Sequence, residues 1–69
     1  MKRVVVIDCE RTEFSITKVL NNHGSLSVKR LRELLESYDD DSEVVLSFDN
    51  GYTYGHLRET SLSEEIMDD

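Results

Sequence analysis

The acidic side chains of one turn are the residues whose spacing comes nearest to a known chemical site. Asp39, Asp41 and Glu43 occupy alternate positions, as the first ligands of a calcium-binding loop do. Counted from Asp39, the sixth position is Val44 where such a loop needs glycine, and the twelfth is Asn50 where it needs glutamate. Both requirements fail, so the sequence predicts a solvated turn and no metal site.

Cys9, the single cysteine, offers a thiol that could serve as a nucleophile or a metal ligand. Asp8 and Glu10 flank it, and neighbouring carboxylates disfavour the thiolate form that both roles need. His23 and His56 do not stand at the spacing of a zinc motif. We therefore predict that the protein is not an enzyme and that it binds no cofactor.

The charge of the chain is divided between its halves. The net charge is −7, with seven Lys and Arg against five Asp and Glu in residues 1–36, and one Arg against ten Asp and Glu in residues 37–69. Binding to phosphate backbones needs Lys and Arg that displace counterions, so the acidic half is unsuited to direct contact with nucleic acid. It favours a protein partner with a basic surface.

Tyrosines stand close to this acidity, and protein interfaces are rich in tyrosine. The candidate partner-binding residues are therefore Asp39, Asp40, Asp41, Asp49, Tyr52 and Tyr54. Their use depends on the elements that position them.

A helix is predicted over Val28–Ser37. Ser27 is a favourable N-cap, and Leu26 and Leu31 stand at the two positions of a hydrophobic staple. The acidic turn ends the helix, because carboxylates at a helix C-terminus oppose the macrodipole. Apolar residues recur at helical spacing and predict one buried stripe, which comprises Val28, Leu31, Leu34, Leu35 and Tyr38.

A β-hairpin is predicted after the turn, with strands over Glu43–Phe48 and Tyr52–Leu57. Alternating apolar residues mark the first strand, and Asn50-Gly51 is a strong hairpin signal. The register of the hairpin decides which face carries the tyrosines.

Two registers stay open. A two-residue type I′ loop pairs Phe48 with Thr53 and turns Tyr52 and Tyr54 away from the core. A three-residue loop with Gly51 in a bulge pairs Phe48 with Tyr52 and turns both tyrosines inward.

The N-terminal residues add one strand and one ambiguous segment. Arg3–Asp8 is rich in β-branched residues, the composition of a strand that is covered on both faces or lies centrally in a sheet. Thr12–Val19 alternates at Phe14 and Ile16, which favours a strand that pairs back on the first. The alternation breaks at Val19 and Leu20, so a short helix that ends near Gly24 stays open as the alternative.

Together these elements predict an α+β fold, in which one helix packs on one face of a small, mainly antiparallel sheet of three or four strands. Residues 1–60 are expected to form a single domain, and residues 61–69 an acidic, flexible tail. A chain of 69 residues buries only about 60% of its unfolded surface, and one cysteine excludes an internal disulfide, so we also consider a homodimer. Without an apolar run that predicts a membrane span or signal peptide, the expected location is the cytoplasm.

The middle of the chain shows a resemblance to known proteins. Residues 26–52 combine a capped helix, an acidic turn, a Val-rich strand and a Gly-Tyr hairpin, and in this they resemble a widespread group of short uncharacterised phage and bacterial proteins. Unlike that group, the chain has no proline in the turn and has an additional N-terminal segment. The residues that carry the resemblance are Leu26-Ser27-Val28, Leu31, Leu34, Leu35, Asp39 to Val45, and Asn50-Gly51-Tyr52. It implies a fold and an origin in a mobile element, and no active site.

The function that we expect is that of a small, acidic, non-enzymatic protein-interaction module of phage or mobile-element origin. One alternative is a phage-type inhibitor, whose carboxylates imitate nucleic acid in the basic groove of a host nuclease or defence complex. Another alternative, a small-ligand-binding protein or an enzyme, lacks a convergent set of polar residues.

Overall fold

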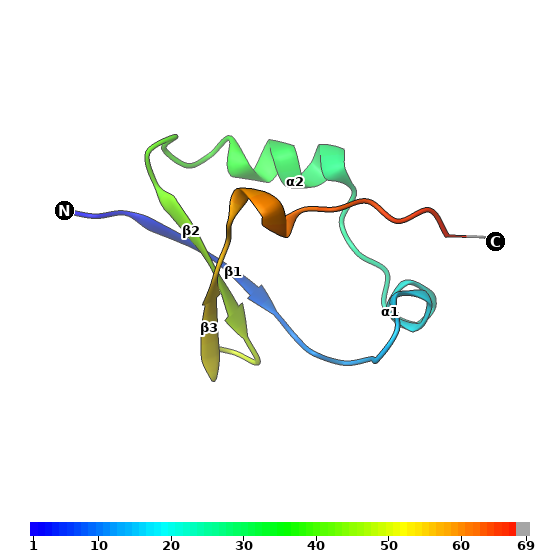
Figure 1. The fold of residues 1–69 in the computed structure, drawn as a ribbon. Helices are drawn as coiled ribbons and strands as arrows, with labels where there is room; N and C mark the ends of the chain where they lie inside the picture. The colour runs from blue at the N-terminus through cyan, green and yellow to red at the C-terminus, as the bar shows by residue number, and fades with distance from the viewer. Residues whose placement is uncertain (68–69) are drawn as a thin grey trace.

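A three-stranded sheet and two α-helices make up the structure, a computed structural model that describes residues 1–67 (Figure 1). The elements in chain order are β1 (Val4–Cys9), α1 (Ile16–Asn22), α2 (Val28–Leu35), β2 (Glu43–Phe48), β3 (Thr53–His56) and the 3₁₀ helix η1 (Glu59–Ser61). The predicted α+β class is confirmed. In the described part of the chain, no helix has the length and apolar character needed to cross a bilayer.

β2 is the central strand of the sheet, whose order is β1-β2-β3. It pairs in parallel with β1 and antiparallel with β3, so the sheet is mixed. The N-terminal strand was predicted to be covered on both faces or to lie centrally, and both alternatives are wrong, because β1 is an edge strand on which Val4 and Val6 are exposed. The β-branched run specifies that β1 is a strand, but it carries no information about the neighbours of that strand. Residues 10–42 supply the long crossover that a parallel pair requires.

The prediction of a strand over Thr12–Val19 is also wrong, because helix capping prevails over β-propensity. The Ser15 hydroxyl accepts a hydrogen bond from the Lys18 N–H at 3.2 Å and so caps α1. At the other end Gly24, with a φ of 76°, donates its N–H to the Val19 carbonyl at 3.0 Å. Ile16, Val19 and Leu20 thus stand at helical spacing, which explains why the alternation breaks at Val19.

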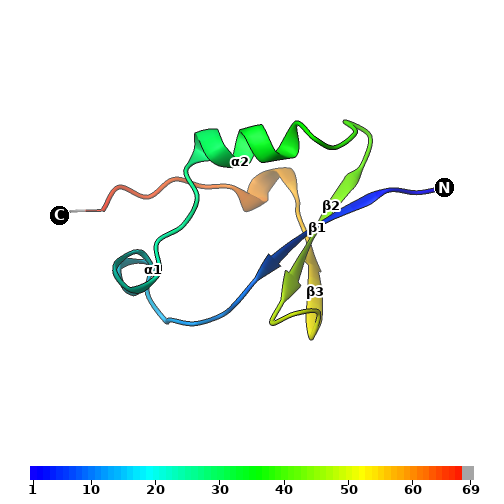
Figure 2. The same cartoon turned by 180° about the vertical axis from the view of Figure 1, so that it is seen from behind.

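α2 begins where the sequence predicts. The Ser27 hydroxyl accepts a hydrogen bond from the Arg30 N–H at 3.1 Å, and the helix ends at Leu35, two residues before the predicted end. Figures 1 and 2 show α2 beside the sheet and α1 apart from it. The two helices therefore differ in what they can bury.

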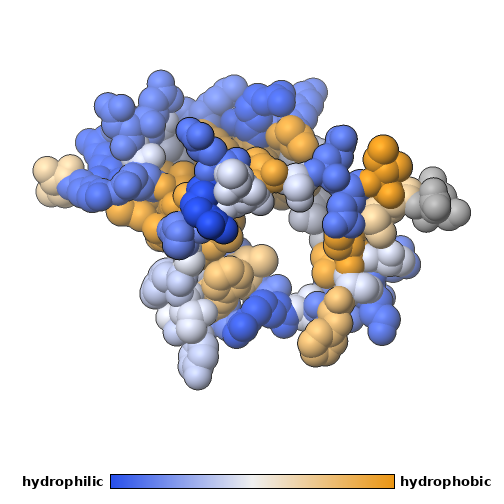
Figure 3. Space-filling model, in the orientation of Figure 1, coloured by the Kyte–Doolittle hydropathy of each residue, from blue (hydrophilic) through white to orange (hydrophobic). Residues whose placement is uncertain are grey.

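Apolar side chains are only partly covered. A hollow of about 670 Å³ separates α2 and the segment before it from the sheet, and its lining includes Ile7, Leu26, Leu31 and Leu46. Figure 3 shows an opening near the middle of the molecule. No apolar residue among residues 1–67 is fully buried, and the one buried side chain is that of Ser47, which is 3% exposed. The expected close packing of the helix on the sheet is therefore incomplete.

The C-terminal segment adds little regular structure. After η1, residues 62–67 form neither helix nor strand, and they are exposed. The remainder of the predicted acidic tail, residues 68 and 69, lies outside the described residues.

Candidate interaction surface

The predicted partner-binding residues fall into two groups at opposite ends of β2. Three aspartates lie in the turn before β2, and the other residues lie in the hairpin after it. Because a strand rises by about 3.3 Å per residue, roughly 17 Å of β2 separates the groups. The first group is Asp39, Asp40 and Asp41, and the second is Asp49, Tyr52 and Tyr54.

The acidic turn is attached to the start of the chain. The Arg3 guanidinium donates a hydrogen bond to the Asp39 carboxylate, and the Lys2 ammonium forms an ion pair with Glu43. Within residues 1–67, no ion pair involves Asp40 or Asp41, which are both exposed. Two carboxylates of this group therefore remain available to a partner, while Asp39 is engaged within the chain.

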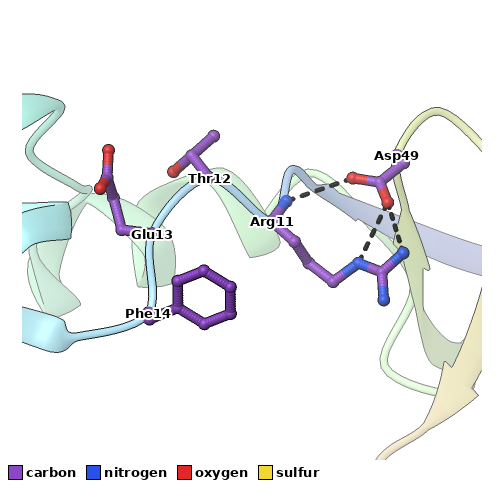
Figure 4. Close-up of a pocket in the computed structure, with 5 residues that line it drawn as sticks. All are labelled: Arg11, Thr12, Glu13, Phe14 and Asp49. Atoms are coloured by element: carbon purple, nitrogen blue, oxygen red, sulfur yellow. Dashed lines mark hydrogen bonds and ion pairs between the residues drawn. The ribbon is translucent and has the colours of Figure 1, made fainter.

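Asp49 is clamped by Arg11 (Figure 4). The Arg11 backbone N–H donates to Oδ1 at 3.2 Å, and its Nε and Nη2 donate to Oδ2 at 3.0 and 2.6 Å. The Arg11 guanidinium carbon also lies 5.9 Å from the centroid of the Phe48 ring, and the Asp49 N–H donates to the Cys9 carbonyl at 3.1 Å. These contacts join the segment after β1 to the hairpin loop.

The clamp also sets the ionisation of this carboxylate. Hydrogen bonds from the Arg11 side chain, and secondarily from its backbone N–H, lower the pKa of Asp49 below its ordinary value of 3.8. Asp49 is therefore fully charged at neutral pH, and its charge is already balanced by Arg11.

Tyr52 and Tyr54 project from the hairpin into solvent. β2 and β3 pair Phe48 with Thr53 and Ser47 with Tyr54, the register that a two-residue loop predicts. The loop is nevertheless longer, because Asp49, Asn50 and Gly51 all have positive φ and the Tyr52 N–H donates to the Phe48 carbonyl at 2.9 Å. Tyr52 is 79% exposed and Tyr54 is 66% exposed.

Tyr54 belongs to a sheet face that we call the open face. Side chains alternate along each strand, and Ile7 and Leu46 point to the hollow beneath α2, so the residues next to them point the other way. Val4 and Val6 are exposed on this side of the sheet, and α2 lies on the other side, across the hollow. The open face is made up of Val4 and Val6 of β1, Glu43 and Val45 of β2, and Tyr54 and His56 of β3. Asp8 and Ser47 continue the same alternation, but Ser47 is buried and Asp8 also lines the hollow.

The open face exposes apolar side chains to solvent. Val4 is 46% exposed, Val6 is 52% exposed, and Tyr54 lies across β2 on the same face. A sheet normally buries at least one face against another layer, and exposed apolar patches mark interaction sites. The arrangement can bind a flat or extended protein surface through valine and tyrosine side chains.

Other polar groups do not converge into a site. Within residues 1–67 no group of three or more His, Cys, Asp or Glu side chains could hold a metal ion. Cys9 is exposed at the end of β1, and the imidazole of His23 lies 3.2 Å from the Glu13 carboxylate, near the end of α1. A shallow hollow of about 310 Å³ beside the Arg11 clamp is lined by Thr12, Glu13 and Phe14 (Figure 4).

Reasoning from sequence missed the internal pairing of Asp39 and Asp49. The unequal charge of the two halves was the available signal, because basic residues near the N-terminus must lie beside acidic residues of the second half once β1 pairs with β2. That pairing is parallel and far apart in sequence, so the specific partners Arg3 and Arg11 could not be named in advance.

Comparisons with known proteins return no match: no protein-family model, curated protein or solved structure matches the chain. The resemblance of residues 26–52 to short phage and bacterial proteins therefore stays a prediction.

Proposed function

We propose that the protein is a small, non-enzymatic protein-interaction module that binds its partner through the open face and the hairpin tyrosines. The observation that carries the proposal is the presence of Tyr52 and Tyr54, both well exposed, on a hairpin beside a sheet face that also exposes Val4 and Val6. Tyrosine offers a large contact area with few rotatable bonds and a hydroxyl for hydrogen bonding, and these properties make it common among energetically dominant interface residues.

Charge favours a partner with a basic surface. The chain carries a net charge of −7, and Asp40 and Asp41 are exposed carboxylates without ion pairs among residues 1–67. Such charges accelerate encounter with a basic protein and disfavour acidic partners. They lie at the far end of β2 from the tyrosines, so they would act at the rim of the contact.

The alternative of nucleic-acid mimicry receives less support. A mimic needs many unpaired carboxylates in a continuous array, whereas Arg3 engages Asp39 and Arg11 engages Asp49. The remaining predicted carboxylates occupy one end of the molecule. An ordinary interface with a few dominant side chains fits the arrangement better.

The origin of the protein remains a proposal of the same kind. We propose a phage or mobile-element origin on the resemblance of residues 26–52 to short phage and bacterial proteins.

Affinity capture with a matched pair of variants tests the proposed surface. Tyr54→Ala removes a tyrosine from the open face, and Tyr38→Ala removes an exposed tyrosine beyond α2. A protein that is captured from a host-cell lysate by the unaltered chain and by Tyr38→Ala, but not by Tyr54→Ala, would support the proposal.

Affinity measurements with the captured protein decide between the two interface types. Tyr52→Ala or Tyr54→Ala should weaken binding by about 2 kcal/mol, with a shallow dependence on salt. A steep dependence on salt, with loss of binding on joint neutralisation of Asp40 and Asp41 and no effect of either tyrosine, would contradict the proposal and favour the mimic.

A further inference from the structure

We propose that β1 is a self-association edge, at which two copies of the chain pair antiparallel to form one continuous six-stranded sheet. The strand order would be β3-β2-β1 in one copy, followed by β1-β2-β3 in the other. The groups that would pair are the backbone N–H and C=O groups at the outer edge of β1, whereas the proposed partner contact uses side chains of the open face and the hairpin, so the two proposals are tested by different variants.

The backbone of β1 defines which groups face outward. The Arg3 carbonyl accepts the Glu43 N–H at 3.2 Å, and the Cys9 carbonyl accepts the Asp49 N–H at 3.1 Å. Because backbone groups of alternate residues point to opposite sides of a strand, Arg3, Val5, Ile7 and Cys9 face β2. Val4, Val6 and Asp8 therefore direct their N–H and C=O groups to the outer edge.

Nothing in the described part of the chain pairs with that edge, since the sheet order ends at β1 and β2 is the one strand bonded to it. Edge strands in soluble proteins are commonly protected by a charge, a proline or a bulge. Here the stretch Val4-Val5-Val6-Ile7 has none of these, and Val4 and Val6 are exposed. The edge is thus a template for another strand.

Charge selects an antiparallel second copy as the occupant. Lys2 and Arg3 precede the apolar stretch, and Asp8 and Glu10 follow it. Parallel pairing of two copies would set like charges side by side, whereas antiparallel pairing sets the basic end of each strand against the acidic end of the other.

The backbone directions restrict the register further. Hydrogen-bonded pairs must join outward-facing residues, which allows a two-fold axis at Val5. This register pairs Val4 with Val6 of the second copy, and Lys2 with Asp8 of the second copy, each twice. Lys2 would then lie between Glu43 of its own chain, with which it is already paired, and the second copy's aspartate.

Sedimentation equilibrium over a wide concentration range provides the first test, and we expect a monomer–dimer equilibrium. Val6→Pro removes an outward N–H and leaves the bonds to β2 intact, so it should weaken dimerisation by at least about tenfold while the circular dichroism stays that of a folded chain. A chain that is monomeric throughout, or a dimer that Val6→Pro leaves unchanged, would overturn the inference.

If Val6→Pro fails to fold, exchanging the charges of Lys2 and Asp8 provides a second test of the antiparallel dimer. Lys2→Glu and Asp8→Lys should each weaken the dimer, because each sets like charges opposite one another at both ends of the contact. The double variant Lys2→Glu/Asp8→Lys should restore dimerisation. Additive weakening in the double variant would exclude this antiparallel pairing.

Disulfide trapping tests the register. In a Cys9→Ser background, Val5→Cys places two thiols at a non-hydrogen-bonded pair on the two-fold axis, where the Cα separation of about 4.5 Å permits a disulfide. We expect rapid oxidation of this variant to a covalent dimer and slow oxidation of the matched Val6→Cys variant. Faster cross-linking through Val6→Cys would overturn the register centred on Val5.

Discussion

The β2–β3 hairpin and the β1–α1 segment have similar apolar content, but the interactions that specify them differ in range. Those of the hairpin are between residues close in sequence, whereas β1 pairs with a distant strand. In the hairpin, the strands and their reversal lie within residues 43–56, and neighbouring residues specify both. In the N-terminal segment, β1 takes its place only by pairing with a strand that begins at Glu43. Local chemistry therefore identifies the hairpin, while the place of β1 depends on contacts that no short window contains.

Among the substitutions that test this difference, Gly51→Val in the hairpin should cause the largest loss of stability. Gly51 has a φ of 87°, where a β-branched residue is strained, and a Cβ there would lie 3.0 Å from the Tyr54 hydroxyl. We expect a loss of about 2–3 kcal/mol in the free energy of unfolding, because the backbone strain persists even if the tyrosine moves aside. Thermal unfolding followed by circular dichroism measures it.

Gly24→Val is the matched control for that substitution. Gly24 also has a positive φ, of 76°, but no atom lies within 4 Å of an added Cβ. Because Gly24 ends a helix that stands apart from the sheet, the strain should be relieved by fraying of α1, and the melting temperature should fall less than for Gly51→Val. An equal or larger fall would show that the hairpin is not the more critical region.

Leu31→Ala should cost about 1–2 kcal/mol, less than the removal of a fully buried leucine, because Leu31 lines the hollow shared with Ile7 and Leu46 but is 39% exposed. Urea unfolding gives the value. The matched variant Leu20→Ala on α1 should cost about 0.5 kcal/mol or less, as is usual for surface positions. If the two costs were equal, α1 would be as well packed as α2.

Ser15→Ala should cost about 1 kcal/mol, and the loss should be local to α1. The variant removes the acceptor of the Lys18 N–H bond. Amide hydrogen exchange should show lost protection at Val19 and His23 and unchanged protection in β2. Loss of protection in both would indicate that α1 and the sheet unfold as one unit.

Arg11→Gln should cause the smallest loss of stability, and the size of that loss should depend on pH. The bonds from Arg11 lower the folded-state pKa of Asp49, so the stabilisation by this pair is complete above 3.8 and is lost as the pH falls through the lower folded-state value. Melting temperatures of the unaltered chain and Arg11→Gln should differ at neutral pH and converge in strong acid.

Asp49→Asn serves as the control for this titration. Without an ionisable group at the loop, Arg11→Gln should no longer alter the pH dependence of melting. The pair is solvent-exposed, so the difference should also shrink at high salt. A pH-dependent difference that survives in the Asp49→Asn background would assign the effect to another group.

Sequence reasoning succeeded where side chains act on the backbone beside them. Ser27 marked the start of α2, the alternation from Glu43 to Phe48 gave the bounds of β2, and Asn50-Gly51 located the reversal. It failed for residues 16–22, because β-branched composition was given more weight than the helix end near Gly24 and the N-cap at Ser15 was not considered. It also failed for the position of β1, because strand order depends on long-range pairing.

The candidate surface was predictable only in part, for related reasons. The exposure of Tyr52 and Tyr54 follows from the hairpin register, which local turn chemistry narrowed to two choices. The open face itself could not be anticipated, because it requires the parallel pairing that brings Val4 and Val6 beside Val45. The same pairing brings Asp39 beside Arg3 and Asp49 beside Arg11, so these two carboxylates form hydrogen bonds within the chain.

Parallel pairing of β1 with β2 has a consequence for synthesis on the ribosome. β1 leaves the exit tunnel before the strand that will hold it, and closing the loop between them has an entropic cost that grows with its length. The β2–β3 hairpin, in contrast, can close within microseconds once both of its strands are free. Val4 to Ile7 therefore have no strand partner until residues 43–48 are also free to fold.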